Sequence, residues 1–201
     1  MTNRFPLAES RTPAGSRASA KSRLHFIVGA LAASFLLLAA ARADPSPDAK
    51  DIQPPWRLRW GESAEQIEPL LKGAKANIVE KRKTDDGEAW TVEGLLQASL
   101  RRTIFYFKNG LLIAVELQYQ DPSWDSARYN DFMAQIRQRI VAQYGEGQLV
   151  ARSKEPMDGN VMQTVVGYKW SQSSTSLELF YFSAENATEI YRTISVHYKA
   201  Y

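Results

Sequence analysis

The sequence predicts an α+β fold in which two tandem units, each a helix followed by an antiparallel meander, form one sheet with the helices packed on one face. Three observations support this prediction. An Asn-Gly turn joins two apolar runs near residue 110, helical apolar spacing occurs in two separate places, and strand-like segments follow each helix. We therefore expect a single domain over residues 56–201, with halves of about 56–120 and 121–201.

The clearest local signal is a hairpin between residues 100 and 120, with its turn at Asn109-Gly110. Asn-Gly favours a type I′ turn because both central residues need a positive φ. Alternation along the two strands then predicts a core face. That face consists of Leu100, Ile104, Tyr106, Leu111, Ile113, Val115, Leu117 and Tyr119. The same alternation places Phe105 and Phe107 on the opposite face.

Four further elements are predicted before this hairpin. Residues 56–60 alternate strictly between apolar and charged side chains and predict a short strand. Ser63 then fits the cap of a helix, with Gln66 at the spacing of a capping box and Gly73 at the end. Two strands are predicted around a polar turn, at 76–82 and 89–96.

The second half shows the same order of signals. Asp121-Pro122 predicts the start of a helix, and Gly145 predicts its end. An apolar stripe between them has helical spacing. It consists of Tyr129, Phe132, Met133, Ile136, Ile140 and Tyr144. Four strands are then expected, at 148–152, 161–170, 176–182 and 189–199.

A short motif indicates an internal repeat. Phe105-Tyr106-Phe107 recurs as Phe180-Tyr181-Phe182, and in each half a helix closed by glycine precedes a strand that ends near a tryptophan. A single unit of this kind leaves an apolar face uncovered, and a second unit can cover it. We therefore interpret the two halves as tandem repeats.

Residues 1–43 have the pattern of a secretory signal peptide. A positively charged stretch precedes an apolar run at 26–41, and Ala41-Arg42-Ala43 matches an A-x-A cleavage site. The alternative is an uncleaved membrane anchor, although the run is shorter than the roughly 20 residues that a spanning helix needs. We expect cleavage after Ala43, a periplasmic or secreted protein, and a proline-rich linker over 44–55. The chain would contact a membrane only through this segment, if it stays uncleaved.

The charge balance argues against nucleic-acid binding. The chain has 25 basic and 22 acidic residues, and six of the basic and one of the acidic residues lie within 1–43. Cleavage would leave 19 basic and 21 acidic residues, without the positive surface that binding to phosphates requires. The chain also contains no cysteine, which excludes disulfides and a lipid-modified cysteine.

The sequence offers no constellation for catalysis. Beyond residue 43 it has one histidine, His197, which the alternation of its strand places on the face opposite the core. With one histidine and no cysteine a zinc site is not expected. The chain has no G-x-S-x-G motif and no glycine-rich nucleotide fingerprint. We therefore predict no enzymatic activity, no cofactor and no metal.

A candidate interaction surface is predicted on the face opposite the core. It consists of Phe105, Phe107, Phe180, Phe182, Tyr191 and His197. A contiguous exposed aromatic patch of this kind marks a binding site. The alternative is that the two meanders pack face to face, or that the linker or Trp56 covers these residues, which would make them part of the core.

Two motifs carry a resemblance to known proteins. Trp60-Gly61-Glu62-Ser63 and the hairpin around Asn109-Gly110 resemble exported bacterial domains that open with a W-G-x-S helix and carry an f-y-f-x-n-G-x-L hairpin. The tandem helix-plus-meander plan is similar to β-lactamase inhibitory protein, and each half to outer-membrane assembly lipoproteins of the SmpA/OmlA type. The chain departs from both, because it lacks the inhibitor's cysteines and the lipidated cysteine of the lipoproteins. The resemblance implies no catalytic or binding residue.

The sequence therefore favours an exported, non-catalytic binding module that contacts another envelope or secreted protein through its aromatic face. One alternative is a carrier that holds an apolar small ligand or lipid between sheet and helices. The other alternative is an envelope hydrolase, for which the residues offer no catalytic group beyond His197.

Overall fold

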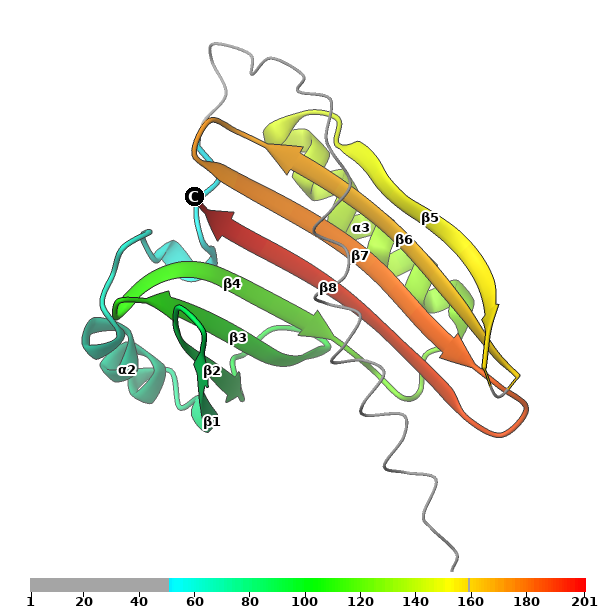
Figure 1. The fold of residues 1–201 in the computed structure, drawn as a ribbon, viewed down its shortest axis with the longest axis horizontal. Helices are drawn as coiled ribbons and strands as arrows, with labels where there is room; N and C mark the ends of the chain where they lie inside the picture. Colours follow the sequence, from blue (N-terminus) through cyan, green and yellow to red (C-terminus); the bar gives the residue numbers. More distant parts are fainter. Residues whose placement is uncertain (1–50, 159) are drawn as a thin grey trace, which may run out of the picture. The chain divides into compact units, whose positions relative to one another are not determined.

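The computed structural model describes residues 51–158 and 160–201. The predicted signal peptide and most of the predicted linker lie outside the described residues, so that cleavage and location stay predictions. The described chain is α+β, with two α-helices and one antiparallel sheet of eight strands (Figure 1). Among the residues that it describes, no helix is long and apolar enough to cross a membrane.

The elements follow the order helix, four strands, helix, four strands. The first group is α2 (Ala64–Gly73), β1 (Asn77–Thr84), β2 (Gly87–Glu93), β3 (Leu100–Lys108) and β4 (Leu111–Tyr119). The second group is α3 (Ser126–Tyr144), β5 (Gln148–Met157), β6 (Val161–Ser171), β7 (Thr175–Glu185) and β8 (Ile190–Ala200). A 3-10 turn, η2 (Pro55–Arg57), precedes α2.

The two groups of strands join at the middle of the sheet. The strand order is β1-β2-β3-β4-β8-β7-β6-β5, and every neighbouring pair is antiparallel. We call the junction of β4 with β8 the seam. At the seam Leu117 lies opposite Val196, with Val115 opposite Tyr198 on one side.

Both helices pack on the same face of the sheet, which we call the helix face. Ile67 of α2 and Tyr129 of α3 belong to one core cluster with alternate residues of the strands. In Figure 1, α3 lies behind β6 and β7. The opposite face, which we call the open face, is covered by neither helix. The prediction of an α+β fold is confirmed.

The predicted start of the first helix is confirmed, and that of the second is wrong. Ser63 Oγ accepts a hydrogen bond from the Gln66 N–H, and Gln66 Oε1 accepts one from the Ser63 N–H, which forms the capping box. The second helix begins four residues later than Asp121-Pro122 predicts. Asp125 caps it, with Oδ1 accepting from the Arg128 N–H at 2.8 Å.

The Asn109-Gly110 turn is confirmed, but the strands that it joins contain a β-bulge. Both turn residues have a positive φ, 51° and 77°. Phe107 pairs with Leu112 as expected, whereas the next pair is Tyr106 with Ala114. Ile113 is therefore an extra residue in β4, and it shifts the alternation of side chains by one position.

The bulge overturns the predicted faces of β3. Phe105 and Phe107 share the helix face with Val115 and are 0% and 2% exposed. Ile104 and Tyr106, which we expected in the core, lie on the open face. The prediction that Phe105 and Phe107 belong to a surface opposite the core is therefore wrong, because a one-residue slip sends every side chain of a strand to the other face.

Residues 51–60, which we call the strap, pack against the helix face. Ile52 is 0% exposed, and its N–H donates to Thr175 Oγ1 at 3.0 Å. Trp60 Nε1 donates to the Ile52 carbonyl oxygen at 2.8 Å. The predicted strand at 56–60 is wrong, because Trp56 and Arg57 have positive φ values that no strand adopts. The packed chain thus begins before residue 56, within the segment expected to be a linker.

Both edge strands of the sheet carry charges. β1 contains Glu80, Lys81, Arg82 and Lys83, and β5 contains Arg152, Lys154, Glu155 and Pro156. An edge strand presents unpaired backbone groups that can recruit another strand, and charged side chains and proline oppose this. The edges are therefore unfavourable places for a partner strand to add.

Candidate functional site on the open face

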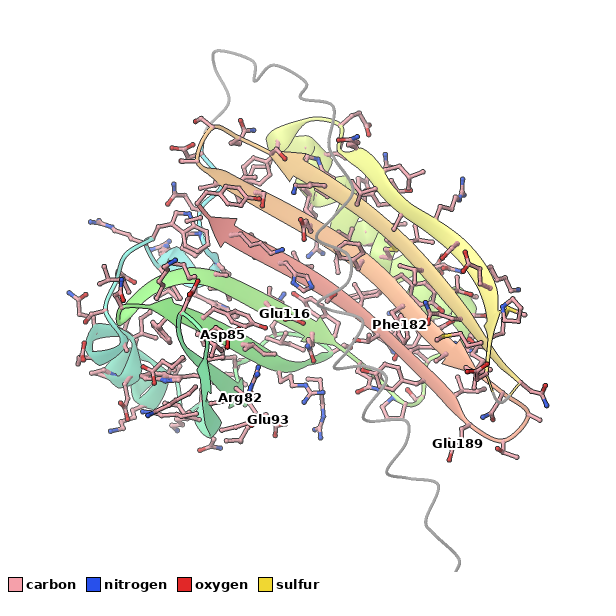
Figure 2. The ribbon with its side chains drawn as sticks, in the orientation of Figure 1. Arg82, Asp85, Glu93, Glu116, Phe182 and Glu189 are labelled. Carbon is pink, nitrogen blue, oxygen red and sulfur yellow. The ribbon has the colours of Figure 1, made fainter. Side chains whose placement is uncertain are left out.

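The structure separates the six residues of the predicted interaction surface. Phe180 and Phe182 of β7 and Tyr191 and His197 of β8 lie on the open face and are partly buried. Phe105 and Phe107 lie in the core instead. The first half of the sheet contributes Tyr106, Glu116 and Gln118 to the open face. Figure 2 views this face, with Glu116 on β4 and Phe182 on β7 among the labelled side chains.

Four ring side chains of the open face form two pairs on neighbouring strands. The Phe180 ring meets the His197 ring edge-on, with centroids 5.9 Å apart. Phe182 meets Tyr191 in the same way at 6.0 Å. Gly167 of β6 makes room for the first pair, because a Cβ at this position would lie 2.3 Å from the Phe180 ring. The aromatic surface is thus fixed in place by its own contacts.

A row of polar side chains crosses the middle of the open face. Lys169, Glu178, His197 and Glu116 are consecutive cross-strand partners on β6, β7, β8 and β4. We call these four residues the seam row. Lys169 Nζ lies 3.2 Å from Glu178 Oε1, and His197 Nε2 lies 3.8 Å from Glu116 Oε1. The row is not evident from the sequence, because only the order of strands in the sheet brings its members together.

The negative charge of Glu178 is balanced by two lysines. Lys199 Nζ donates to Glu178 Oε2 at 2.9 Å, on the side opposite Lys169. Burial raises the pKa of Glu178, but the hydrogen bonds and charges of Lys199 and Lys169 outweigh it and hold the pKa below its ordinary value. Glu178 is therefore a carboxylate with its charge balanced within the protein.

Glu116 is held by neutral groups. It is 9% exposed, and its Oε2 accepts a hydrogen bond from the Tyr106 hydroxyl at 3.0 Å. Its Oε1 accepts from Gln118 Nε2, and Gln118 Oε1 in turn accepts from Arg102 Nε at 2.7 Å. Burial and the charge of Glu116 raise the pKa of Tyr106, so that the hydroxyl keeps its proton and donates. Within the described residues, His197 is the one basic side chain at ion-pair distance from Glu116.

A serine lies beside the histidine, but the arrangement differs from a nucleophilic triad. Ser195 Oγ is 2.9 Å from His197 Nε2, the nitrogen that also faces Glu116. In a Ser-His-acid triad the serine and the acid contact opposite nitrogens of the imidazole. In the described part of the chain, no group of three or more histidine, aspartate or glutamate side chains is placed to hold a metal ion. The site is best described as a row of polar side chains with the two aromatic pairs on one side of it.

The pairing of Glu178 predicts a pH-dependent contribution to stability. Because its pKa is lowered on folding, the contribution is present above the ordinary value of 4.5 and is lost as the pH falls through the lowered pKa of the folded state. We expect wild type to be more stable than Glu178→Gln at pH 7, with the gap closing below pH 4.5. Urea unfolding followed by circular dichroism measures this, since urea does not screen charges. A gap that stays constant down to pH 3 would contradict the prediction.

No protein-family model, curated protein or solved structure matches the chain significantly. The resemblance carried by the W-G-x-S and hairpin motifs therefore stays an interpretation of the sequence. What the protein does has to be inferred from the open face itself.

Proposed function

We propose that the protein is an exported, non-catalytic binding module that contacts another envelope or secreted protein through its open face. One observation carries the proposal: partly buried aromatic side chains lie next to a polar row at the centre of a sheet face that neither helix covers. Aromatic side chains beside fixed polar groups are typical of the energetic centre of a protein interface.

The position of this surface also favours binding. Its residues lie on β4, β7 and β8, which are paired on both sides, and hydrogen bonds fix the polar side chains. A preorganised surface loses little conformational entropy when a partner binds. The charged edges make strand addition unfavourable, so that a partner would meet the face rather than an edge.

The two alternative functions find less support. A carrier would need a ligand-binding space between the sheet and the helices. That layer is filled by fully buried side chains, among them Ile52, Ile67, Phe105, Leu179 and Ile194. A hydrolase would need an oriented base, and the serine and the acid compete for one nitrogen of His197. Export itself rests on the pattern of residues 1–43.

We also propose that the two halves are tandem repeats related by a local two-fold axis through the Leu117–Val196 pair. A rotation about this axis matches Val115 to Ile194 and Tyr119 to Tyr198. It therefore superimposes the Val115–Tyr198 pair of the seam on the Ile194–Tyr119 pair. The F-Y-F motifs are not equivalent in this arrangement. Phe105 lies in the core, whereas Phe180 lies on the open face, and their strands differ by the bulge in β4.

The proposed function predicts that a negative charge on the open face abolishes partner binding. The test is affinity capture from an envelope extract with the tagged protein, its Phe182→Glu variant, and a Leu70→Glu control. Leu70 lies on α2 and is 56% exposed, so that its substitution adds the same charge away from the open face. We expect a protein that wild type and the control retain and that Phe182→Glu loses.

Folding of each variant is checked by circular dichroism and thermal melting. A partner that folded Phe182→Glu still retains, while Leu70→Glu loses it, would place the interface elsewhere and overturn the proposal. Absence of any partner from the extracts of the natural host would also count against a binding module.

A further inference from the structure

Glu116 is the buried carboxylate of the open face that has no lysine or arginine of the described chain at ion-pair distance. We propose that Glu116 receives a cationic side chain, arginine or lysine, from the partner protein, and that protonation of His197 competes with that side chain. This inference rests on the proposed function, because it concerns the partner that would bind to the open face.

Glu178, the other carboxylate of the seam row, has Lys169 and Lys199 at ion-pair distance. Glu116 is buried to a similar extent as Glu178. A buried carboxylate without a cation is costly, and the cost increases when a partner removes the remaining water. A neutral or acidic partner surface would leave that charge unpaired.

The geometry of Glu116 suits reception of a cation. The Tyr106 hydroxyl and Gln118 Nε2 bind one carboxylate oxygen each, and Arg102 fixes Gln118 from behind. The carboxylate is therefore held in one position before a partner arrives. Burying a preorganised charge pair strengthens its attraction, because the surrounding water is excluded.

His197 provides the competing charge. Imidazole side chains gain their proton in the range of pH 5 to 8. The ionisable groups that face His197 are Glu116 from β4, Glu178 from β7 and Lys199 from its own strand. One strand further lie Lys169 on β6 and, on β3, Tyr106 and Arg102. Because two lysines already balance Glu178, a proton on His197 acts chiefly on Glu116, 3.8 Å away.

The sign of the pH effect follows from this arrangement. Protonated His197 supplies the missing positive charge to Glu116 and repels a second cation from the partner. Binding of a cationic side chain should therefore be strong near pH 7.5 and weaker near pH 5.5. Removing the imidazole should abolish that difference and leave binding at pH 7.5 in place.

The test uses a displayed library of random dodecapeptides, selected on the full-length protein at pH 7.5. We expect the enriched peptides to share an arginine or lysine at one position and to bind the folded Glu116→Gln variant about tenfold or more weakly. Replacing that basic residue by alanine in the peptide should cause the same loss. Affinity for wild type should fall at pH 5.5, and affinity for His197→Gln should not.

The outcomes separate this inference from the proposed function. Peptides that Phe182→Glu loses but Glu116→Gln retains, or peptides without a shared basic residue, would overturn the inference and leave the binding face standing. Peptides that bind Phe182→Glu as tightly as wild type, or a selection without enrichment, would overturn both the inference and the proposed function. A pH dependence that persists in His197→Gln would overturn the competition by His197.

Discussion

Replacing Phe105 with alanine is expected to lower the free energy of unfolding by about 3–5 kcal/mol, the usual cost of deleting a buried aromatic side chain. Phe105 is 0% exposed, pairs with Val115 beside the seam, and lies 6.1 Å from the Trp56 ring of the strap. It therefore touches the sheet and the strap at the same point. Deleting the Phe105 ring leaves a cavity that the sheet and the strap can fill only if their backbones move.

The matched control for this experiment is Phe180→Ala. The same side chain is removed, but from the open face, where Phe180 is only partly buried. We expect this loss to be about 1–2 kcal/mol, within the ordinary range of single substitutions. Urea unfolding at pH 7 measures both. Equal losses, or a larger loss for Phe180→Ala, would show that the two faces of the sheet are assigned wrongly.

Replacing Ile52 with alanine is expected to lower the free energy of unfolding by about 2–5 kcal/mol. Ile52 is fully buried, and its backbone links Thr175 to Trp60, so that the strap is held to the sheet by packing and by two hydrogen bonds. Shortening the side chain removes the packing and loosens both bonds.

The control is the neighbouring substitution Asp51→Ala. Asp51 is exposed, and substitutions of exposed residues usually change stability by less than about 0.5 kcal/mol. If Ile52→Ala proves as harmless as Asp51→Ala, residues 51–60 are a linker after all, as their composition suggests.

The sequence was sufficient for features that depend on neighbouring residues. The Asn109-Gly110 turn and the capping box of Ser63 and Gln66 are local signals, and both are confirmed. The apolar stripe of the second helix is confirmed in the same way, with Tyr129 and Met133 among its buried members. Helical spacing and turn chemistry are properties of a few consecutive residues, which a single sequence displays.

Three features depended on information that the local pattern does not contain. Because of the bulge at Ile113, the side chains of β3 lie on the opposite faces from those we predicted. The alternation of residues along β3 gives no sign of this bulge. The strap has the prolines of a linker, although Ile52, the one large apolar residue in the predicted linker, was a signal that we overlooked. The seam row joins Glu116 to His197 across strands that only the complete sheet order makes neighbours.

The strap has a consequence for how the chain reaches its native state. The hydrogen bond from Ile52 to Thr175 spans 123 residues, and the last residue, Tyr201, donates its N–H to the Ser174 carbonyl oxygen in the same turn. Both ends of the described chain thus meet at one place. Contacts between such distant residues form late, because the loop that joins them must close first. The core of the first half is incomplete until the second half has folded and the strap can pack against it. We therefore expect the protein to fold and unfold in a single cooperative step.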